Sequence, residues 1–286
     1  MAISAADVKK LRDQTGAGMM DCKAALEEAK GNVEEATTVL RKKGLASAAK
    51  KAGRATSEGL IGQRLSADRS AGTLVQVNCE SDFVARTDDF QQLIADVLDA
   101  IDKAGDEATE AWLQDPSGPV QLRVAASIGK LGENMGVPRF VRYAGQGHVG
   151  QYIHMGGKIG VQVEFGGVTP AIASSDAFRT LVKEIAMQVA AASPAYTSRS
   201  AVPTAALEKE KAIYRAQMEN AGKPANVIDK IVDGKLGSFY SQVVLPDQPS
   251  IRDPKMTVAQ VLAAAAKDLG APVTVTRFAR LKVGDL

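Results

Sequence analysis

Hydrophobic positions along this chain follow two periods, and the change from one to the other predicts where strands give way to helices. Residues 73–77 alternate with β-branched side chains and predict a strand, and residues 60–64 are a second candidate strand. From Asp88 onward apolar residues recur at intervals of three and four, until Gly105 ends the pattern. That spacing predicts a helix with one buried face. Strands and helices mixed in this way indicate an α+β fold.

The first 44 residues predict three short helices. Ser4 can cap the first helix, and Gly16 is expected to end it. The second is expected over residues 20–30, and the third is expected to begin at Asn32 and to end at Gly44. Ala and Leu supply only a thin core for these helices. We therefore expect the three helices to form a small module that is separate from the rest of the chain.

The whole chain has 286 residues, which is enough for about two domains with a substantial core. We expect five segments: a three-helix module at residues 1–45, a helical or flexible linker at 46–56, a first α+β subdomain at 57–145, a second at 146–202 and 241–286, and an inserted helical hairpin at 203–240. Later β-rich runs predict a further sheet from residues 139–143, 149–155 and 159–165, and a strand at 242–245. The hairpin is expected to protrude and to leave an apolar stripe in need of a partner, namely Leu207, Ile213, Tyr214 and Met218.

Residues 80–84, Glu-Ser-Asp-Phe-Val, form a short acidic and aromatic tip between a predicted strand and a predicted helix. An exposed Phe83 beside Asp82 suits insertion into a partner, because the ring fills a pocket while the carboxylate competes for hydrogen-bond donors. The alternative is that Phe83 packs into the local core, as most aromatic side chains do. These residues alone favour the core alternative.

A second unusual segment lies in the N-terminal module. Met19 and Met20 are adjacent at a helix start, with Arg12 about one helical turn before the glycine-rich turn. Two methionines offer a soft, adaptable apolar contact patch. Equally, both can fill the core between the helices, and the residues themselves leave the two interpretations open.

The net charge is only +2, so the chain as a whole is no polyanion binder. Its distribution is uneven, because residues 1–56 hold eleven Lys and Arg against seven Asp and Glu, whereas residues 80–115 hold eleven Asp and Glu against two Lys and Arg. The acidic segment suits a basic protein partner, or it is simply a solvated helix face. An RNA- or ribosome-associated binding module is an alternative function suggested by the basic segment, although the acidic segment and the scarce aromatics argue against it.

The remaining chemical signals are weak. Cys22 and Cys79 lie far apart with no CxxC, so they indicate neither a zinc site nor a disulfide framework, and reduced thiols fit the cytosol. No apolar run approaches the ~20 residues that cross a bilayer, and the N-terminus resembles no signal peptide. We therefore expect a cytoplasmic protein. Residues 145–150 match GxGxxG, but a β-type run follows where a dinucleotide site needs a helix, so a hairpin turn is favoured over a dinucleotide-dependent enzyme.

A series of runs, in order along the chain, resembles one family of proteins. They are VKKLRDQTGAGMMDCKAALEEAKGNVEEA, KAGR, VNCESDFVAR, KLGEN, IAMQVAA, ENAGKP and TVTRFARLKVG. Together they closely resemble bacterial elongation factor Ts over essentially the whole chain. The resemblance implies a guanine-nucleotide exchange factor for elongation factor Tu, the GTPase that delivers aminoacyl-tRNA. It also implies a ubiquitin-associated-like three-helix module, a two-subdomain α+β core and an inserted antiparallel coiled-coil hairpin.

The resemblance also implies which residues contact the partner. In this family the Asp and Phe of the tip intrude into the GTPase near its magnesium site. They correspond here to Asp82 and Phe83, and Ser81 and Val84 complete the motif. Family members also place the Arg and the paired Met of the N-terminal module against the same GTPase domain. Those positions are occupied by Arg12, Met19 and Met20.

Such a factor needs no covalent chemistry and no cofactor, so we expect no enzyme activity and no direct binding of nucleotide, metal, membrane or nucleic acid. A homodimer and a 2:2 complex with the partner, through the core or the hairpin, are both left open. Two departures from the family bear on affinity. Gln188 stands where many members have a His that contacts the partner, and the chain ends at Leu286, before the extra helical segment of longer members. We expect these contacts to be weaker or to be replaced by others.

Overall fold

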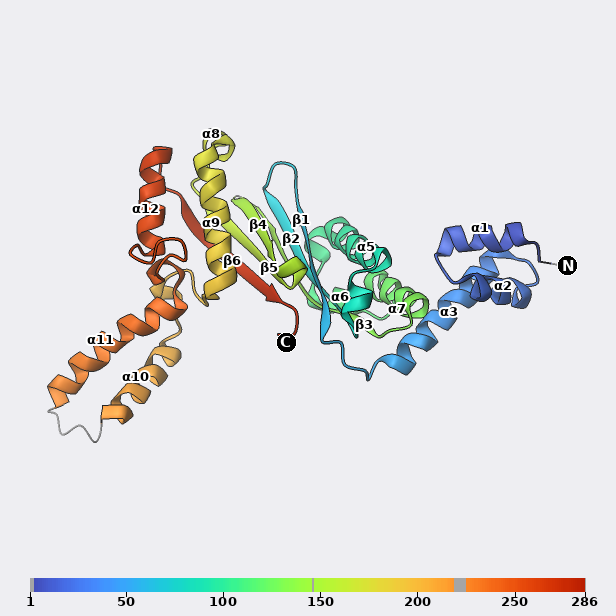
Figure 1. The fold of residues 1–286 in the computed structure, drawn as a ribbon, viewed down its shortest axis with the longest axis horizontal. Helices are drawn as coiled ribbons and strands as arrows, with labels where there is room; N and C mark the ends of the chain where they lie inside the picture. Colours follow the sequence, from blue (N-terminus) through green and yellow to red (C-terminus); the bar gives the residue numbers. More distant parts are fainter. Residues whose placement is uncertain (1–2, 146, 219–224, 286) are drawn as a thin grey trace.

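The computed structural model describes residues 3–145, 147–218 and 225–285, and it confirms an α+β fold with two small antiparallel sheets (Figure 1). The described chain is elongated. It runs from three helices at the N-terminal end, through the two sheets, to a pair of helices at the opposite end. Short 3-10 turns join several elements, namely Gly105–Glu107, Met155–Gly157, Arg199–Ala201 and Leu245–Asp247.

Three helices form the N-terminal end: α1 (Ala5–Thr15), α2 (Met19–Glu28) and α3 (Val33–Lys51). They pack around a small core in which Leu11, Cys22 and Leu26 are fully buried. The first cap is confirmed, because the Ser4 hydroxyl accepts the Asp7 N–H at 3.1 Å. A left-handed glycine, Gly16, ends α1 as expected.

The third helix is longer than the sequence indicated, because it continues through Gly44 to Lys51. Gly44 is buried, and a Cβ atom there would lie 3.3 Å from the carbonyl oxygen of Ala125 in α7 (Pro119–Leu131). The glycine allows two helices to approach closely, so its role is packing and not termination. The second half of α3 thus lies along α7, and much of the expected linker is helical.

The first sheet has the strand order β1-β2-β3, with antiparallel pairs throughout: β1 (Glu58–Leu65), β2 (Ala71–Cys79) and β3 (Met135–Ala144). The run at residues 139–143, expected to join the later strands, instead pairs with β2, so that expectation was wrong. The physical reason is burial, because Met135 and Val137 complete the core beneath the helices of the first subdomain.

Helices cover one face of this sheet: α4 (Asp82–Ala85), α5 (Asp88–Ala104), α6 (Glu110–Gln114) and α7. The predicted helix from Asp88 is confirmed, and Gly105 ends it with φ of 58°. The apolar α5 positions are all buried: Phe90, Leu93, Ile94, Val97, Leu98 and Ile101. The short α6 was not predicted, and it contributes the buried Leu113.

The second sheet has the order β4-β5-β6: β4 (His148–His154), β5 (Ile159–Gly166) and β6 (Thr274–Lys282). Its helices are α8 (Pro170–Ser174), α9 (Asp176–Ala192) and α12 (Val258–Leu269). Phe165 of β5 and Phe178 of α9 meet edge to face, with ring centroids 5.6 Å apart, inside this second core. The sheet therefore combines two consecutive strands with one from near the end of the chain.

The two sheets pack against each other through their inner faces (Figure 1). Ile61 and Leu74 of the first sheet form one buried cluster with Leu281 of the second. Gly160 permits this approach, because a Cβ atom at that position would lie 2.3 Å from Cγ2 of Ile61. Each sheet thus has helices on its outer face and the other sheet on its inner face.

Two further helices lie side by side and extend away from the sheets: α10 (Thr204–Met218) and α11 (Ala225–Val243). Of the expected apolar stripe, Ile213 is exposed, whereas Leu207, Tyr214 and Met218 are half-buried. The strand expected at residues 242–245 was wrong, because α11 continues to Val243 and a 3-10 turn follows. Residues 219–224 of the expected hairpin lie outside the described part of the chain.

A charged contact also joins the sheets. Glu164 of β5 is nearly buried, and its carboxylate accepts two hydrogen bonds of 2.9 Å from the Arg277 guanidinium. That guanidinium lies 4.1 Å from the ring centroid of Tyr143 in the first sheet. The hydrogen bonds from Arg277 lower the pKa of Glu164 below its ordinary value of 4.5.

A carboxyl pKa that is lowered in the folded state stabilises the protein above the unfolded pKa, and this contribution is lost as pH falls through the folded value. We expect Glu164→Gln to lower the free energy of unfolding by about 1–2 kcal/mol at pH 7, since Arg277 is partly exposed. The difference from wild type should shrink as the pH falls below 4.5. Urea unfolding at several pH values measures it, and a loss independent of pH would assign the effect to packing.

Candidate partner interface

The tip between β2 and α5 is a single helical turn, α4, with a hydrogen-bonded residue at each end. Ser81 begins the turn, and its hydroxyl accepts the Val84 N–H at 3.3 Å. At the other end, the Thr87 hydroxyl donates to the Val84 carbonyl at 2.8 Å and accepts the Phe90 N–H at 3.3 Å. These bonds give α4 a defined direction relative to α5.

The tip residues divide into two pairs. Val84 packs against the core of the first subdomain, and Ser81 is half-buried. In contrast, Phe83 is 81% exposed, so the alternative that its ring packs into the local core is wrong for this structure. The Asp82 carboxylate lies 2.7 Å from the guanidinium of Arg86, at the surface. The tip therefore presents an aromatic ring and a carboxylate together to the outside.

Behind the tip, two glutamates join it to the segment that follows α7. The Glu133 carboxylate accepts the Ser81 N–H at 3.0 Å and the Ser81 O–H at 2.5 Å. The second glutamate belongs to the tip: the Glu80 carboxylate accepts the Asn134 N–H at 2.6 Å. It also lies 3.5 Å from the Arg54 guanidinium. No role was expected for Arg54, Glu133 and Asn134, although the runs KAGR and KLGEN contain them.

Cys79 lies just before the tip and supports it without being reactive. Its thiol donates to the Ser81 carbonyl, with 3.1 Å between sulfur and oxygen. Burial, reinforced by the nearby Glu133 carboxylate, raises the pKa of Cys79 to about 12. A thiol with that pKa remains protonated at neutral pH, and the thiolate is the nucleophilic form.

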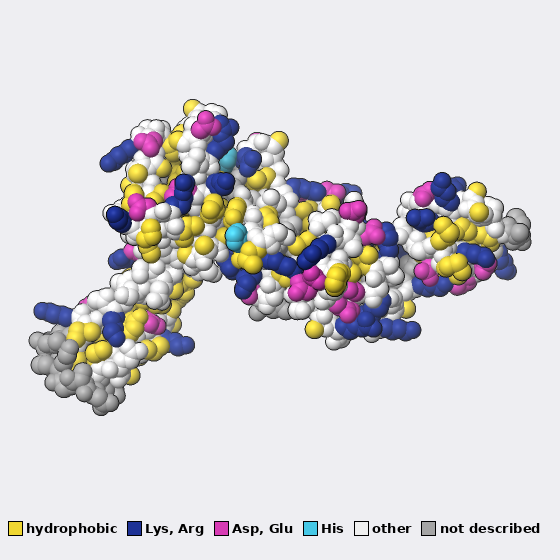
Figure 2. Space-filling model, viewed as in Figure 1, with side chains coloured by type: hydrophobic (Ala, Val, Ile, Leu, Met, Phe, Trp, Pro, Cys, Tyr) yellow, Lys and Arg dark blue, Asp and Glu magenta, His cyan; other side chains and the backbone are white. Residues whose placement is uncertain are grey.

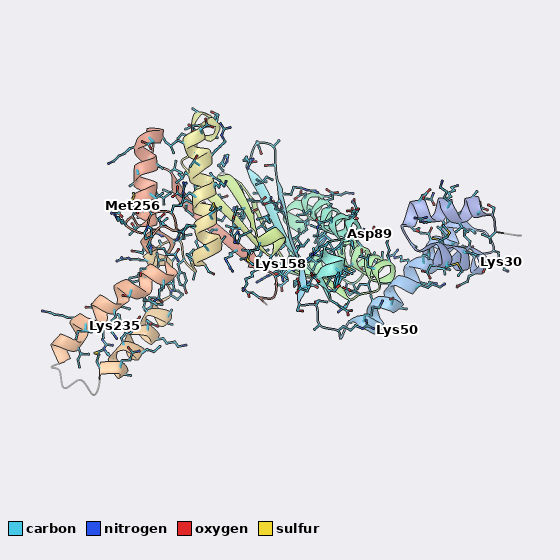
Figure 3. The ribbon with its side chains drawn as sticks, viewed as in Figure 1. Lys30, Lys50, Asp89, Lys158, Lys235 and Met256 are labelled. Carbon is cyan, nitrogen blue, oxygen red and sulfur yellow. The ribbon has the colours of Figure 1, made fainter. Side chains whose placement is uncertain are left out.

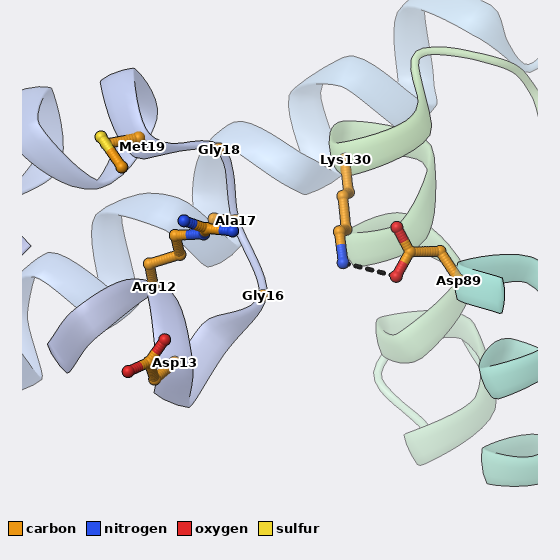
Figure 4. A pocket seen from close by; sticks show the side chains of 8 residues that line it. All are labelled: Arg12, Asp13, Gly16, Ala17, Gly18, Met19, Asp89 and Lys130. Atoms are coloured by element: carbon orange, nitrogen blue, oxygen red, sulfur yellow. Dashed lines mark hydrogen bonds and ion pairs between the residues drawn. The ribbon is translucent and has the colours of Figure 1, made fainter. Parts of the chain in front are cut away.

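The N-terminal module places Arg12 and Met19 around one pocket of about 640 Å³ (Figure 4). The pocket also includes Asp89 and Lys130 of the first subdomain, whose charged groups lie 2.6 Å apart. Met19 is 56% exposed and Met20 is 73% exposed, so neither fills the core of the small bundle. The structure thus brings Arg12 and Met19 together around the pocket between module and core, whereas Met20 does not line it.

Both predicted surfaces lie near one end of α7. Lys130, in the last turn of α7, lines the pocket beside the module, and Glu133 bonds to the tip three residues later. Asp89, in the first turn of α5, lies on the side of the core that faces the module (Figure 3). The pocket beside the module and the tip thus both lie near the C-terminal end of α7.

A sequence model described as "Elongation factor TS" matches residues 80–285, a span that begins at the tip and covers well over half of the chain. Proteins named elongation factor Ts are similar along their whole length. The one from Trichlorobacter lovleyi is 45% identical, over 100% of this chain and 94% of its own. The one from Aquifex aeolicus is 42% identical, over 100% and 99%.

The chain belongs to the elongation factor Ts family. The relative from Prosthecochloris aestuarii, 44% identical over 99% of both chains, agrees with this conclusion. Family membership confirms the resemblance that the ordered sequence runs indicated. It places the chain among the translation elongation factors.

Gln188, expected to be a departure from the family that bears on affinity, is buried within this chain. Its side-chain N–H donates to the Gln248 side chain at 3.1 Å and to the Pro249 carbonyl at 3.2 Å. Its side-chain oxygen accepts the Ile251 N–H at 2.8 Å. Three internal hydrogen bonds therefore give Gln188 a structural role in holding the segment that leads into α12.

The acidic segment at residues 80–115 has much of its charge paired within the chain. Five aspartates of α5 and the turn after it contact arginine and lysine side chains of the first subdomain, in the pairs Asp89–Lys130, Asp96–Arg123, Asp99–Arg64, Asp102–Arg64 and Asp106–Arg142. Figure 2 shows basic and acidic side chains next to one another over this part of the molecule. The idea that this segment attracts a basic partner therefore loses much of its support.

The glycine-rich match at residues 145–150 and the histidine within it have structural roles. The expected hairpin turn at residues 145–150 was wrong, because β3 ends at Ala144 in one sheet and β4 begins at His148 in the other; residue 146 is not described. The expected strand does follow. His148 packs edge to face on Phe178, and burial lowers the pKa of its imidazole.

Within residues 3–145, 147–218 and 225–285, no helix combines the length and apolarity that a membrane span requires. The same residues include no group of three or more potential ligands arranged to hold a metal ion.

Proposed function

We propose that this member of the elongation factor Ts family is a guanine-nucleotide exchange factor for elongation factor Tu, which promotes GDP release so that GTP can rebind during elongation. The observation that supports this most is Phe83, 81% exposed on a turn that is bonded at both ends. An exposed aromatic side chain lacks the stabilisation of about 1.5–3 kcal/mol that its burial would give. Insertion into a pocket of a partner recovers that free energy, as aromatic anchors of interfaces do.

The proposed mechanism is intrusion of the tip near the magnesium site of the GTPase. Phe83 enters between elements of the GTPase domain, and Asp82 competes for hydrogen-bond donors there. Ser81 and Val84 hold the turn, since the first caps it and the second packs against the core. Displacing the groups that hold Mg²⁺ leaves the nucleotide phosphates less neutralised, so GDP dissociates faster.

Thermodynamic linkage sets what such a factor can do. If it binds the nucleotide-free GTPase better than the nucleotide-bound form, it must weaken nucleotide binding by the same factor. Release of GDP and of GTP are both accelerated, and the excess of GTP in the cell gives the exchange its direction. The proposal needs no covalent step, no cofactor and no direct binding of nucleotide or metal by this chain.

The N-terminal module supplies the second proposed contact with elongation factor Tu. Arg12 and Met19 line one pocket, and Met20 is exposed beside Met19. Two contacts on one chain raise the effective concentration of the second once the first has formed. The proximity of both surfaces to the end of α7 supports this arrangement, because it lets them act on one partner domain.

We assign the architecture of the family to the chain as follows. Residues 1–45 form the ubiquitin-associated-like module, 46–56 the linker, 57–145 the first subdomain, 146–202 with 241–286 the second, and 203–240 an inserted coiled-coil hairpin. The packing of α10 on α11 supports the hairpin. The core and the hairpin are the two candidate surfaces for a homodimer or a 2:2 complex, and the cytoplasm is the proposed location.

The proposal is tested by stopped-flow release of a fluorescent GDP analogue from the cognate elongation factor Tu, with and without this chain. We expect release to accelerate by at least tenfold at saturation, a barrier change of about 1.4 kcal/mol. No acceleration by a folded chain would contradict the proposed function. Removing Mg²⁺ with EDTA tests the mechanism separately, because a tip that acts through the metal site should accelerate release much less once the metal is gone.

A further inference from the structure

Glu133 lies just after α7, and both of its carboxylate oxygens bond to the residue that begins the tip. One oxygen accepts the Ser81 N–H at 3.0 Å, and the other accepts the Ser81 O–H at 2.5 Å. Bonds to an ionised carboxylate are shorter and about twice as strong as neutral ones. Both groups are part-buried, which limits competition from water.

The Ser81 hydroxyl passes this constraint to the tip. While it donates to Glu133, the same oxygen accepts the Val84 N–H and so orients the first turn of α4. A further bond between the same two segments, from Asn134 N–H to the Glu80 carboxylate, is 2.6 Å long. Residues 80–81 and 133–134 are thus joined by three hydrogen bonds directly behind Phe83.

We infer that Glu133 is a positioning residue for nucleotide exchange, which holds α4 in the direction that lets Phe83 enter the partner. This inference rests on the proposed function. A helix of four residues is too short to be stable alone, because nucleating a turn costs more than its few bonds return. Without Glu133, only a fraction of molecules would hold α4 in the direction that lets Phe83 enter the partner. The rate of exchange would then fall in proportion to that fraction.

The first test compares Glu133→Ala and Glu133→Gln in the stopped-flow assay over a range of chain concentrations. We expect Glu133→Ala to lower the maximal rate of GDP release about tenfold, since it removes two hydrogen bonds to a charged group. Glu133→Gln should recover part of the rate, because its single carbonyl oxygen still accepts one of the two Ser81 donors. An unchanged maximal rate in Glu133→Ala would overturn the inference.

Asp96→Ala is the matched control. Asp96 accepts a 2.6 Å hydrogen bond from Arg123 and so links α5 to α7 in the same subdomain, without a bond to the tip. We expect this variant to lose a comparable amount of thermal stability and to keep the wild-type maximal rate. Equal slowing by Asp96→Ala and Glu133→Ala would show that general support of the subdomain, and not positioning of the tip, sets the rate.

A double-substitution cycle with Phe83→Ala separates positioning from direct contact. If Glu133 acts only through the ring, Glu133→Ala should slow the Phe83→Ala chain no further. A full additional tenfold loss in that background would mean that Glu133 acts on the partner by another route, contrary to the inference.

Hydrogen exchange of the free chain tests the geometry independently of any partner. We expect amides of residues 81–86 to exchange at least about tenfold faster in Glu133→Ala than in wild type, while amides within α5 stay protected. Unchanged protection would overturn the inference even if GDP release slowed. Conversely, a wild-type chain that fails to accelerate release would refute the proposed function, and this comparison would still decide whether Glu133 holds the tip.

Discussion

Replacing Phe83 with Ala is expected to slow the accelerated release of GDP from elongation factor Tu by roughly 100-fold. An aromatic anchor at the centre of an interface contributes about 2–4 kcal/mol, and each ~1.4 kcal/mol of barrier is tenfold in rate. The ring is 81% exposed in the free chain, so its removal deletes no core packing. The melting temperature should therefore stay close to that of wild type, which thermal unfolding measures beside the stopped-flow assay.

The chain offers a matched control seven residues later. Phe90 is fully buried on the inner face of α5, and Phe90→Ala should lower the free energy of unfolding by about 3–5 kcal/mol. The exchange activity of Phe90→Ala should fall only in proportion to the fraction of molecules that remain folded. Phe83→Ala that exchanges like wild type would transfer the intruding role to Asp82 or to the module. Phe83→Ala that unfolds would mean that the ring packs inward in solution, contrary to its exposure here.

Local features of the fold were predictable because their causes lie within a few residues. The α5 helix follows from apolar spacing between Asp88 and Gly105, and both its face and its end were confirmed. Likewise Ser4 caps α1 through the neighbouring Asp7. In each case the interacting groups lie within one or two helical turns, so the sequence pattern alone contains the information.

Features that depend on distant contacts were not predictable in this way. Gly44 looked like a helix end, yet it is buried against Ala125 of α7, which the sequence places far away. The strand β3 looked like part of the second sheet, yet burial of Met135 and Val137 assigns it to the first. A glycine and a β-rich run have the same local signature in both roles, and only tertiary packing distinguishes them.

The candidate site shows the same division. Residues 80–84 were recognisable as unusual, but exposure of Phe83 was not, since aromatic side chains are more often buried. What determines its exposure is the direction of α4, and that direction depends on Ser81 and Glu133, which are 52 positions apart. The family resemblance named the tip residues without indicating that a carboxylate after α7 holds them.

Substituting both Met19 and Met20 with Ala is expected to weaken binding to elongation factor Tu without altering the maximal exchange rate. The side chains are 56% and 73% exposed, and burying them in an interface contributes about 2–3 kcal/mol together, or roughly 30- to 150-fold in affinity. The half-saturating concentration in the stopped-flow assay should rise by that factor. Because the methionines lie outside the bundle core, circular dichroism should show an intact fold.

Phe83→Ala should lower the maximal rate of GDP release, whereas the double Met19 and Met20 variant should raise the half-saturating concentration. This difference tests the division of roles between tip and module. Substituting Met19 and Met20 with Leu, which keeps apolar volume, should restore most of the affinity, as volume-conserving exchanges usually do. Loss of maximal rate at an unchanged half-saturating concentration would mean that the module acts on nucleotide release itself. A wild-type affinity in the Ala variant would remove the methionines from the interface and leave Arg12 as the remaining contact of the module.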